Sequence, residues 1–253
     1  MTVAAAQALV EQASGKPVLV QADPDLKLIA KITIARGDTP AHVVTFNPKY
    51  GEAVDYHIVA QCGHALRVYL TPPADRFDVA STEAGRREAA TLVEQHLRHG
   101  GTDLPAHVRG RLGDQLYDGL ILQLRSIPVG CRVDAWVRDT FPALVEPQRR
   151  SALRQLDEYQ AALAPQIKKI APETIYRASL GMNAAFAAFW GRELSDPAVT
   201  IPYKVAGLLP LGEELLAAAD GLPSAPASDR ALIRAWGDLL GIGGWYAFSP
   251  FGG

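Results

Sequence analysis

The sequence is poor in cysteine. It has two, Cys62 and Cys131, in 253 residues. They lie far apart, form no CxxC pair and do not build the disulfide framework that small secreted domains use. A reducing compartment, most simply the cytoplasm, is therefore the predicted location.

Long hydrophobic runs are also missing. The stretches richest in apolar residues, such as 184–190, are far shorter than the roughly 20 residues that cross a bilayer. The N-terminal segment has no basic n-region and reaches Glu11 before any long apolar core forms. It therefore predicts a short amphipathic helix rather than a signal peptide, and no membrane partner is expected.

Neither sign of charge dominates. The 25 basic and 27 acidic side chains leave a net charge of −2. This balance gives no overall electrostatic reason to expect nucleic acid as the main partner. The sequence leaves association into a homo-oligomer open.

An ordinary share of apolar residues, 48%, is enough for a globular core. Short apolar or alternating segments predict strands over 17–21, 28–36 and 41–47. Helical patterns follow over about 51–69 and 81–99, and helices fill most of the remainder. The predicted fold class is α+β and predominantly α, with a small antiparallel sheet packed against the helix 51–69 and an all-helical half after it.

Prolines divide that second half. Breaks are expected at Pro128, Pro142, Pro165 and Pro172, because proline lacks the N–H that a helix interior needs. A last helix is predicted near 229–240, before an aromatic tail over 245–248. We expect an α+β domain over 1–104 and a helical domain over 105–253, or one continuous domain in which the two halves share a core.

The helix 51–69 carries the most informative segment, Ala60-Gln61-Cys62-Gly63-His64. In an HExxH motif, two histidines at positions i and i+4 face one side of a helix and bind zinc, and the glutamate after the first histidine is the general base. The apolar residues before the segment, the glycine before His64 and the leucine two positions after it all fit this pattern. Two positions do not, because Ala60 replaces the first histidine and Gln61 replaces the glutamate.

In its order of elements the segment resembles the ImmA/IrrE-like family of minimal zincins. The strand 41–47, the connection 48–56 and the helix carrying the degenerate motif follow one another as they do in that family. The resemblance covers about residues 28–99 and implies a zincin-like scaffold. Nothing after Gly100 adds to it.

The resemblance also implies roles for residues outside the motif. A third metal ligand is expected from the next helix, where Glu88 is the best match and Glu83 and Glu94 come next. The strand before the motif is expected to align a substrate backbone by β-augmentation. Its substrate-edge residues are Val43, Val44 and Thr45.

The two replacements argue against zinc-dependent hydrolysis. His64 and Glu88 are vestigial metal-ligand candidates, and two protein ligands are one fewer than a catalytic zinc site uses. Gln61, at the position of the general base, cannot take a proton from water at neutral pH. We therefore expect no cofactor as the chain is written, and zinc only if the motif were intact.

Three functions are compatible with the sequence. The first is a pseudoenzyme, in which a zincin-like scaffold binds a peptide or protein without turnover. The second is a zinc metallopeptidase of the HExxH type, present as an inactivated variant. The third is an unrelated helical interaction module, which predicts no cleft between strand and helix at His64. In that case the helical half could support dimerisation, and exposed apolar surface along Leu153, Leu156 and Leu163 would be the sign.

Overall fold

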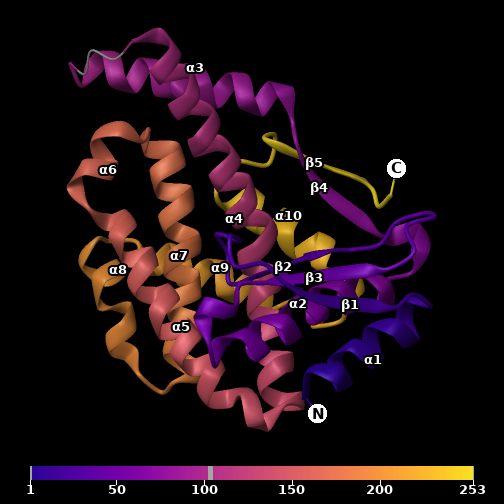
Figure 1. Ribbon diagram of the computed structural model, residues 1–253. Coiled ribbons are helices and arrows are strands. Elements are labelled where there is room, and N and C mark those ends of the chain that lie inside the picture. The colour runs from indigo at the N-terminus through magenta and orange to yellow at the C-terminus, as the bar shows by residue number, and fades with distance from the viewer. Residues whose placement is uncertain (1, 102–104, 253) are drawn as a thin grey trace.

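Two small sheets lie against a body of helices in the computed structural model, which describes residues 2–101 and 105–252 (Figure 1). The fold is α+β and mostly helical, as predicted. The strands are β1 (Val18–Ala22), β2 (Ala30–Thr33), β3 (His42–Phe46), β4 (Phe77–Ser81) and β5 (Tyr246–Pro250). The helices are α1 (Thr2–Ser14), α2 (Ala53–Leu70), α3 (Glu83–His99), α4 (Ala106–Thr140), α5 (Val145–Gln160), α6 (Pro165–Ile170), α7 (Glu173–Glu193), α8 (Ile201–Val205), α9 (Leu209–Asp220) and α10 (Asp229–Leu239).

The first sheet has the strand order β1-β3-β2. β2 pairs antiparallel with β3, with Ala30 opposite Phe46, whereas β1 pairs parallel with β3, with Val18 opposite His42. The prediction of an antiparallel sheet is therefore wrong for one of its two strand pairs. The chain reverses at β2 and again at β3, and β3 then inserts between β1 and β2, so it runs in the same direction as β1.

The predicted substrate-edge residues occupy the wrong strand for that role. Val43, Val44 and Thr45 lie in β3, the central strand, whose two sides are both taken by neighbouring strands. The hydrophobic pattern of β3 reflects burial inside the sheet, because Val44 is fully buried. The edge strand on this side of the sheet is β2 instead.

The second sheet joins the two ends of the sequence. β5, which overlaps the segment predicted as an aromatic tail and extends two residues beyond it, pairs antiparallel with β4, with Phe77 opposite Pro250. The second half is therefore not all helical. A single buried cluster runs from α1 through α2 and α4 to α10. The predicted boundary next to residue 104 falls at 102–104, outside the described residues.

α4 shows how burial overrides a local signal. The helix runs unbroken for 35 residues and contains Pro128, where a break was predicted. Proline removes one backbone hydrogen bond, but it and its neighbours Leu124, Ile127 and Val129 are buried, so packing on both sides holds the helix together. The stops expected at Pro142, Pro165 and Pro172 each coincide with a helix boundary.

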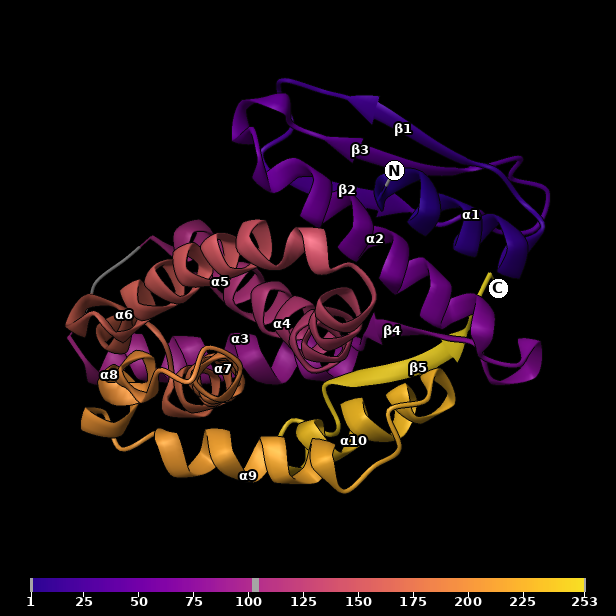
Figure 2. The same cartoon turned by 90° about the horizontal axis from the view of Figure 1, so that it is seen from below.

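α2 is the helix that positions the site. Figure 2 shows α1 and α2 between the first sheet and the helical body. Gly63 lies where α2 meets α4, and a Cβ there would stand 2.8 Å from Val133 Cγ1 and 2.9 Å from the Trp136 ring. The glycine of the degenerate motif thus allows close approach of two helices. This contact fixes α2 against the body of the protein.

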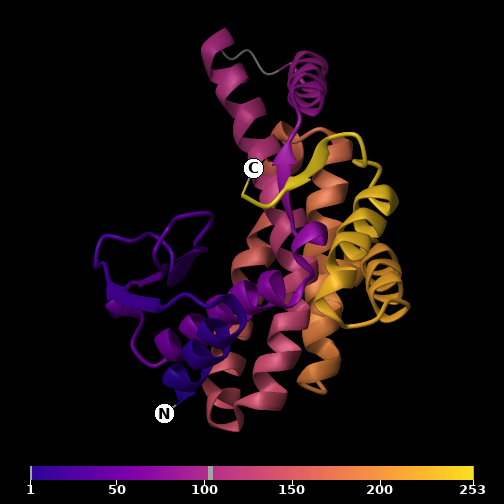
Figure 3. The same cartoon turned by 90° about the vertical axis from the view of Figure 1, so that its right-hand side faces the viewer.

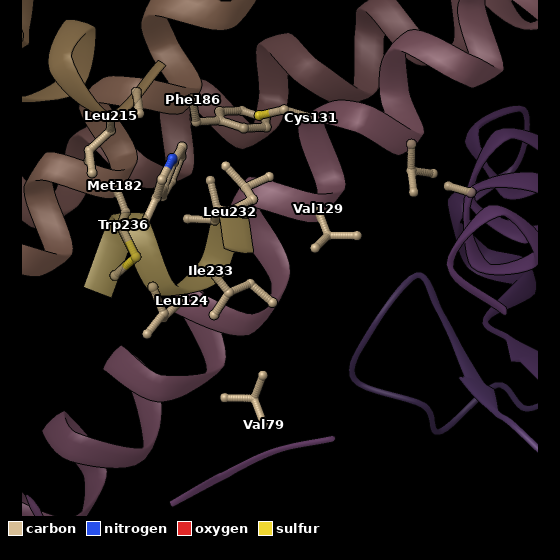
Figure 4. Packing of buried hydrophobic residues seen from close by; sticks show 14 of the residues in the cluster. Val79, Leu124, Val129, Cys131, Met182, Phe186, Leu215, Leu232, Ile233 and Trp236 are labelled. Carbon is tan, nitrogen blue, oxygen red and sulfur yellow. The ribbon is translucent and has the colours of Figure 1, made fainter. Parts of the chain in front are cut away.

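On the other side of α4, large side chains fill the core. Figure 4 shows residues of four helices meeting there: Leu124 of α4, Met182 and Phe186 of α7, Leu215 of α9 and Trp236 of α10. Trp236 is fully buried. Among the described helices, none combines the length and the apolar character that crossing a bilayer requires.

Candidate functional site

A cavity of about 510 Å³ opens beside α2, and its walls come from segments far apart in the sequence. Gln61 and His64 line it from α2, and Ile32, Thr33 and Ile34 line it from β2 and the residues that follow. The remaining walls come from β4, from the middle of α4 and from the start of α10. In Figure 3 the first sheet lies to one side of this region and β5, in yellow, lies to the other.

The two motif residues that were singled out both face this cavity. Gln61 and His64 are three residues apart, which places them on neighbouring turns of one helix face. Ala60, where a zincin has its first histidine, is buried and is not among the lining residues. The cavity therefore presents an amide and an imidazole side by side.

His64 is held in its neutral form. Burial lowers its pKa to about 4, and the nearby guanidinium of Arg67 adds to that effect, with Arg125 contributing less and Asp229 opposing it. No hydrogen bond connects the imidazole to another described residue. One ring nitrogen of a neutral imidazole donates and the other accepts, so His64 offers a ligand one of each.

Two arginines share one carboxylate in the wall of the cavity, that of Asp229. Arg67 donates to Asp229 through Nε to Oδ2 at 2.6 Å and through Nη2 to Oδ1 at 2.7 Å. Arg132 donates to the same Oδ1 through Nη1 at 2.9 Å. These three side chains are only 8–13% exposed. Two buried positive charges thus share one negative charge.

Three further arginines line the cavity. Arg36 forms a two-bonded ion pair with Asp78, at 2.7 and 2.8 Å. Arg76 donates to the main-chain oxygens of Thr71 and Tyr69, both at 3.0 Å, and has no carboxylate partner among the described residues. Arg125 is exposed and has no hydrogen bond or ion pair to any described residue.

The edge strand β2 presents free main-chain groups here. In an antiparallel pair, residues alternate between those that bond to the partner strand and those that point away from it. The amide of Asn47 donates to the carbonyl of Ile29 at 2.9 Å, so the next pairs that bond across the ladder are Lys31 with Thr45 and Thr33 with Val43. Ile32 therefore directs its N–H and C=O away from β3, on the side of the strand that lines the cavity.

The donor set does not fit the zinc ion that the resemblance implies. Glu88 is exposed on α3, which packs on α4 and α6 and lies well away from α2 (Figure 1). Glu83 pairs with Arg87, and Glu94 pairs with Arg98, on that same helix. In the two described stretches, no three His, Cys, Asp or Glu side chains come close enough to hold a metal. The predicted pairing of His64 with Glu88 is therefore not found.

The chain matches no protein-family model, no curated protein and no solved structure. The resemblance to minimal zincins accordingly rests on the order of β2, β3 and α2 and on the motif residues alone.

The charged residues of the site are not marked by any motif in the sequence. Arg67 could have been found, because it lies three residues after His64 and so shares its helix face. Arg125 and Asp229 come from helices much later in the chain, and no spacing connects them with the motif. The resemblance gives the substrate-edge role to the strand before the motif, which is β3, but the order of strands along the chain does not tell an edge strand from a central one.

Proposed function

We propose that the chain is a non-catalytic, zincin-like module that binds an extended peptide segment of a partner protein. The observation that carries the proposal is the free edge of β2 beside Gln61 and His64. A peptide that pairs with Ile32 would extend the sheet by one strand and run along the cavity above α2. Recognition of this kind takes affinity from main-chain hydrogen bonds and specificity from the side-chain cavities beside the strand.

The size of the cavity agrees with this use. A volume of about 510 Å³ lies within the range of natural ligand sites, roughly 300–1,000 Å³. It is far too small for a folded domain, but it takes a few side chains of an extended segment. The mixed lining of isoleucines, threonines, arginines and an imidazole suits a polypeptide better than a purely apolar ligand.

Among the described residues, the site does not bring together the base and the ligands that zinc-dependent peptide hydrolysis of the HExxH type uses. Gln61 lines the cavity at the position of the general base, and its amide does not accept a proton from water at neutral pH. Ala60 provides no ligand, and Glu88 lies on a different part of the molecule. These three residues together support binding without turnover.

The remaining alternatives are less well supported. A helical module that dimerises would expose apolar surface along α5 and the turn after it, but Leu156 is buried and Leu153 and Leu163 are partly buried against the core. The same hypothesis predicts no cleft between strand and helix at His64, and a cavity lies there. An inactivated peptidase would need a third metal ligand near His64, and the described residues supply none.

Selection from a phage library of random octapeptides tests the proposal, with Ile32→Pro as the decisive variant. Proline removes the outward N–H of Ile32 without breaking the β2–β3 ladder, because that N–H does not bond to β3. We expect peptides selected on the natural chain to lose at least tenfold in affinity for Ile32→Pro and to bind Ile32→Val normally. Circular dichroism checks that both variants fold.

Two results would overturn the proposal. Equal binding by Ile32→Pro and Ile32→Val would show that the strand edge does not take part. Stoichiometric zinc in the purified protein, together with cleavage of the selected peptides, would show that the site is catalytic.

A further inference from the structure

The charge of the cavity differs from that of the chain around it. Four arginines and two aspartates line it, an excess of two positive charges while His64 is neutral, whereas the whole chain has a net charge of −2. Concave, partly desolvated sites concentrate such a field and attract ligands of the opposite charge. A negatively charged ligand is favoured on this ground alone.

A buried arginine bound to the lining residue Asp229 favours a negatively charged ligand as well. Arg132 is 9% exposed, and its Nη2 is buried without a hydrogen-bond partner in the described chain. Its positively charged guanidinium shares the single carboxylate of Asp229 with Arg67. A buried positive charge that is only half compensated is costly, and an anion placed nearby lowers that cost.

Two cavity arginines are available for direct contact. Arg125 has no partner among the described residues, and Arg76 engages main-chain carbonyls and the Tyr69 ring but no carboxylate. Guanidinium groups bind carboxylates through two parallel hydrogen bonds. Arg125 and His64 line the same cavity, so one carboxylate between them would meet a guanidinium and an imidazole N–H.

Resting on the proposed function, we infer that the peptide bound along β2 is acidic and that Arg125 binds a carboxylate in the cavity beside His64. That carboxylate belongs to an Asp or Glu side chain or to the C-terminus of the peptide. Both sources offer the same planar, two-oxygen acceptor to the guanidinium, and the structure favours this chemistry over basic or uncharged segments.

A positional-scanning library of octapeptides tests the inference. Each position is fixed in turn as Glu, Ala or Lys, and binding is measured by fluorescence polarisation. One arm uses peptides capped at both ends, and the other leaves the C-terminal carboxylate free. We expect one or two positions to favour Glu over Lys by at least tenfold in the capped arm, or the free C-terminus to be favoured by the same factor in the other.

Arg125→Ala is the variant that assigns the contact. It should reduce binding of the best acidic peptide about tenfold, as expected for loss of one charge-assisted interaction, and should reduce the preference for Glu at one position only. Arg111→Ala is the matched control, since Arg111 is an exposed arginine on the same helix and lies outside the cavity. It should bind like the natural chain.

The outcomes separate this inference from the proposed function. Peptide binding that depends on Ile32 but shows no preference for acidic residues overturns the inference and leaves the proposed function standing. Binding of no peptide in either arm overturns both. Equal loss of affinity in Arg125→Ala and Arg111→Ala overturns the assignment to Arg125. Displacement of bound peptide by inorganic phosphate well below 1 mM would identify a phosphate site and also overturn the inference.

Discussion

α2 carries two histidines that lie in contrasting polar sites two turns apart. His57 is in a closed cluster, where its Nε2 lies 2.6 Å from Ser151 Oγ and its ring meets Tyr56 edge to face at 4.7 Å. Next to it, the Tyr56 hydroxyl donates to buried Asp134 at 2.6 Å. His64 lies in the open site, where it faces the cavity and has no hydrogen bond to a described residue.

The pKa alone does not distinguish the two sites. Burial lowers the pKa of both imidazoles to about 4, with Arg154 assisting at His57 and Arg67 at His64. The difference lies in whether the polar side chains around each histidine find hydrogen-bond or ion-pair partners. In the closed site, each polar side chain finds a partner within the protein, whereas the open site leaves Arg125 unpaired and Arg132 partly unpaired. A closed polar cluster stabilises the fold. An open cluster whose arginines lack carboxylate partners is suited to binding a ligand.

Replacing Asp229 with alanine should have the largest effect, because it breaks the open site at its base. Asp229→Ala leaves Arg67 and Arg132 buried without their carboxylate, which should lower the free energy of unfolding by about 3–5 kcal/mol. Urea unfolding followed by tryptophan fluorescence measures this loss. Asp238→Ala, at an exposed position on the same helix, should change stability by about 0.5 kcal/mol or less.

A loss below about 1 kcal/mol in Asp229→Ala would contradict the charge argument, since removing one partner of a truly buried ion pair costs several times more. The two arginines would then have to be solvated. The open site would in that case hold no buried arginine charge without compensation, and it would not differ from the closed site in this respect.

The closed site should make the free energy of unfolding depend on pH. Burial raises the pKa of Asp134 to about 7 from its ordinary 3.8, although the hydrogen bond from Tyr56 opposes the shift. The folded protein therefore holds this proton more tightly than the unfolded chain does, so the carboxyl's contribution to stability falls as pH rises from about 4 to 7. Below that window both states are protonated, and above it the full penalty remains.

Asp134→Asn isolates this effect, because asparagine keeps an acceptor for Tyr56 but does not titrate. Relative to the natural chain, Asp134→Asn should gain about 2–4 kcal/mol in unfolding free energy between pH 4 and pH 8. Unfolding curves of both proteins at each pH provide the measurement. A difference that stays constant with pH would show that Asp134 is ionised normally and that the closed site is not dry.

The sequence predicts single elements of this molecule better than the way they meet. α1 ends just before Gly15 and α7 begins just after Pro172, and both boundaries follow from the local preferences of glycine and proline. The continuation of α4 through Pro128 depends on burial by other helices, which no local pattern contains. The pairing of β5 with β4 joins segments more than 160 residues apart. The sequence of neither strand identifies the other as its partner.

The residues of the candidate site likewise include some that the sequence predicts and some that only the tertiary fold brings together. Gln61 and His64 were found because both lie on one helix face with recognisable spacing. Arg125 and Asp229 reach the cavity from α4 and α10, so their part in it depends on the tertiary fold. Glu88 was expected by resemblance, but α3 packs at another part of α4 and takes it elsewhere. Residues within one helix are predictable, and convergence between helices is not.

Exchanging each histidine for alanine gives the smallest effect and the most direct test of the contrast. At pH 7 both imidazoles are neutral, so charge does not enter. His57→Ala removes the partner of buried Ser151 and should lower the free energy of unfolding by about 2 kcal/mol. His64→Ala removes no hydrogen bond within the protein and should cost about 0.5 kcal/mol.

Peptide affinity should show the opposite order. His64→Ala should weaken the peptides selected on the natural chain several-fold, because the imidazole faces the cavity, and His57→Ala should leave their affinity unchanged as long as the protein is folded. Each variant is thus the control for the other. Equal destabilisation by both, with no difference in peptide binding, would mean that His64 is simply another packing residue and that the cavity beside it is not the binding site.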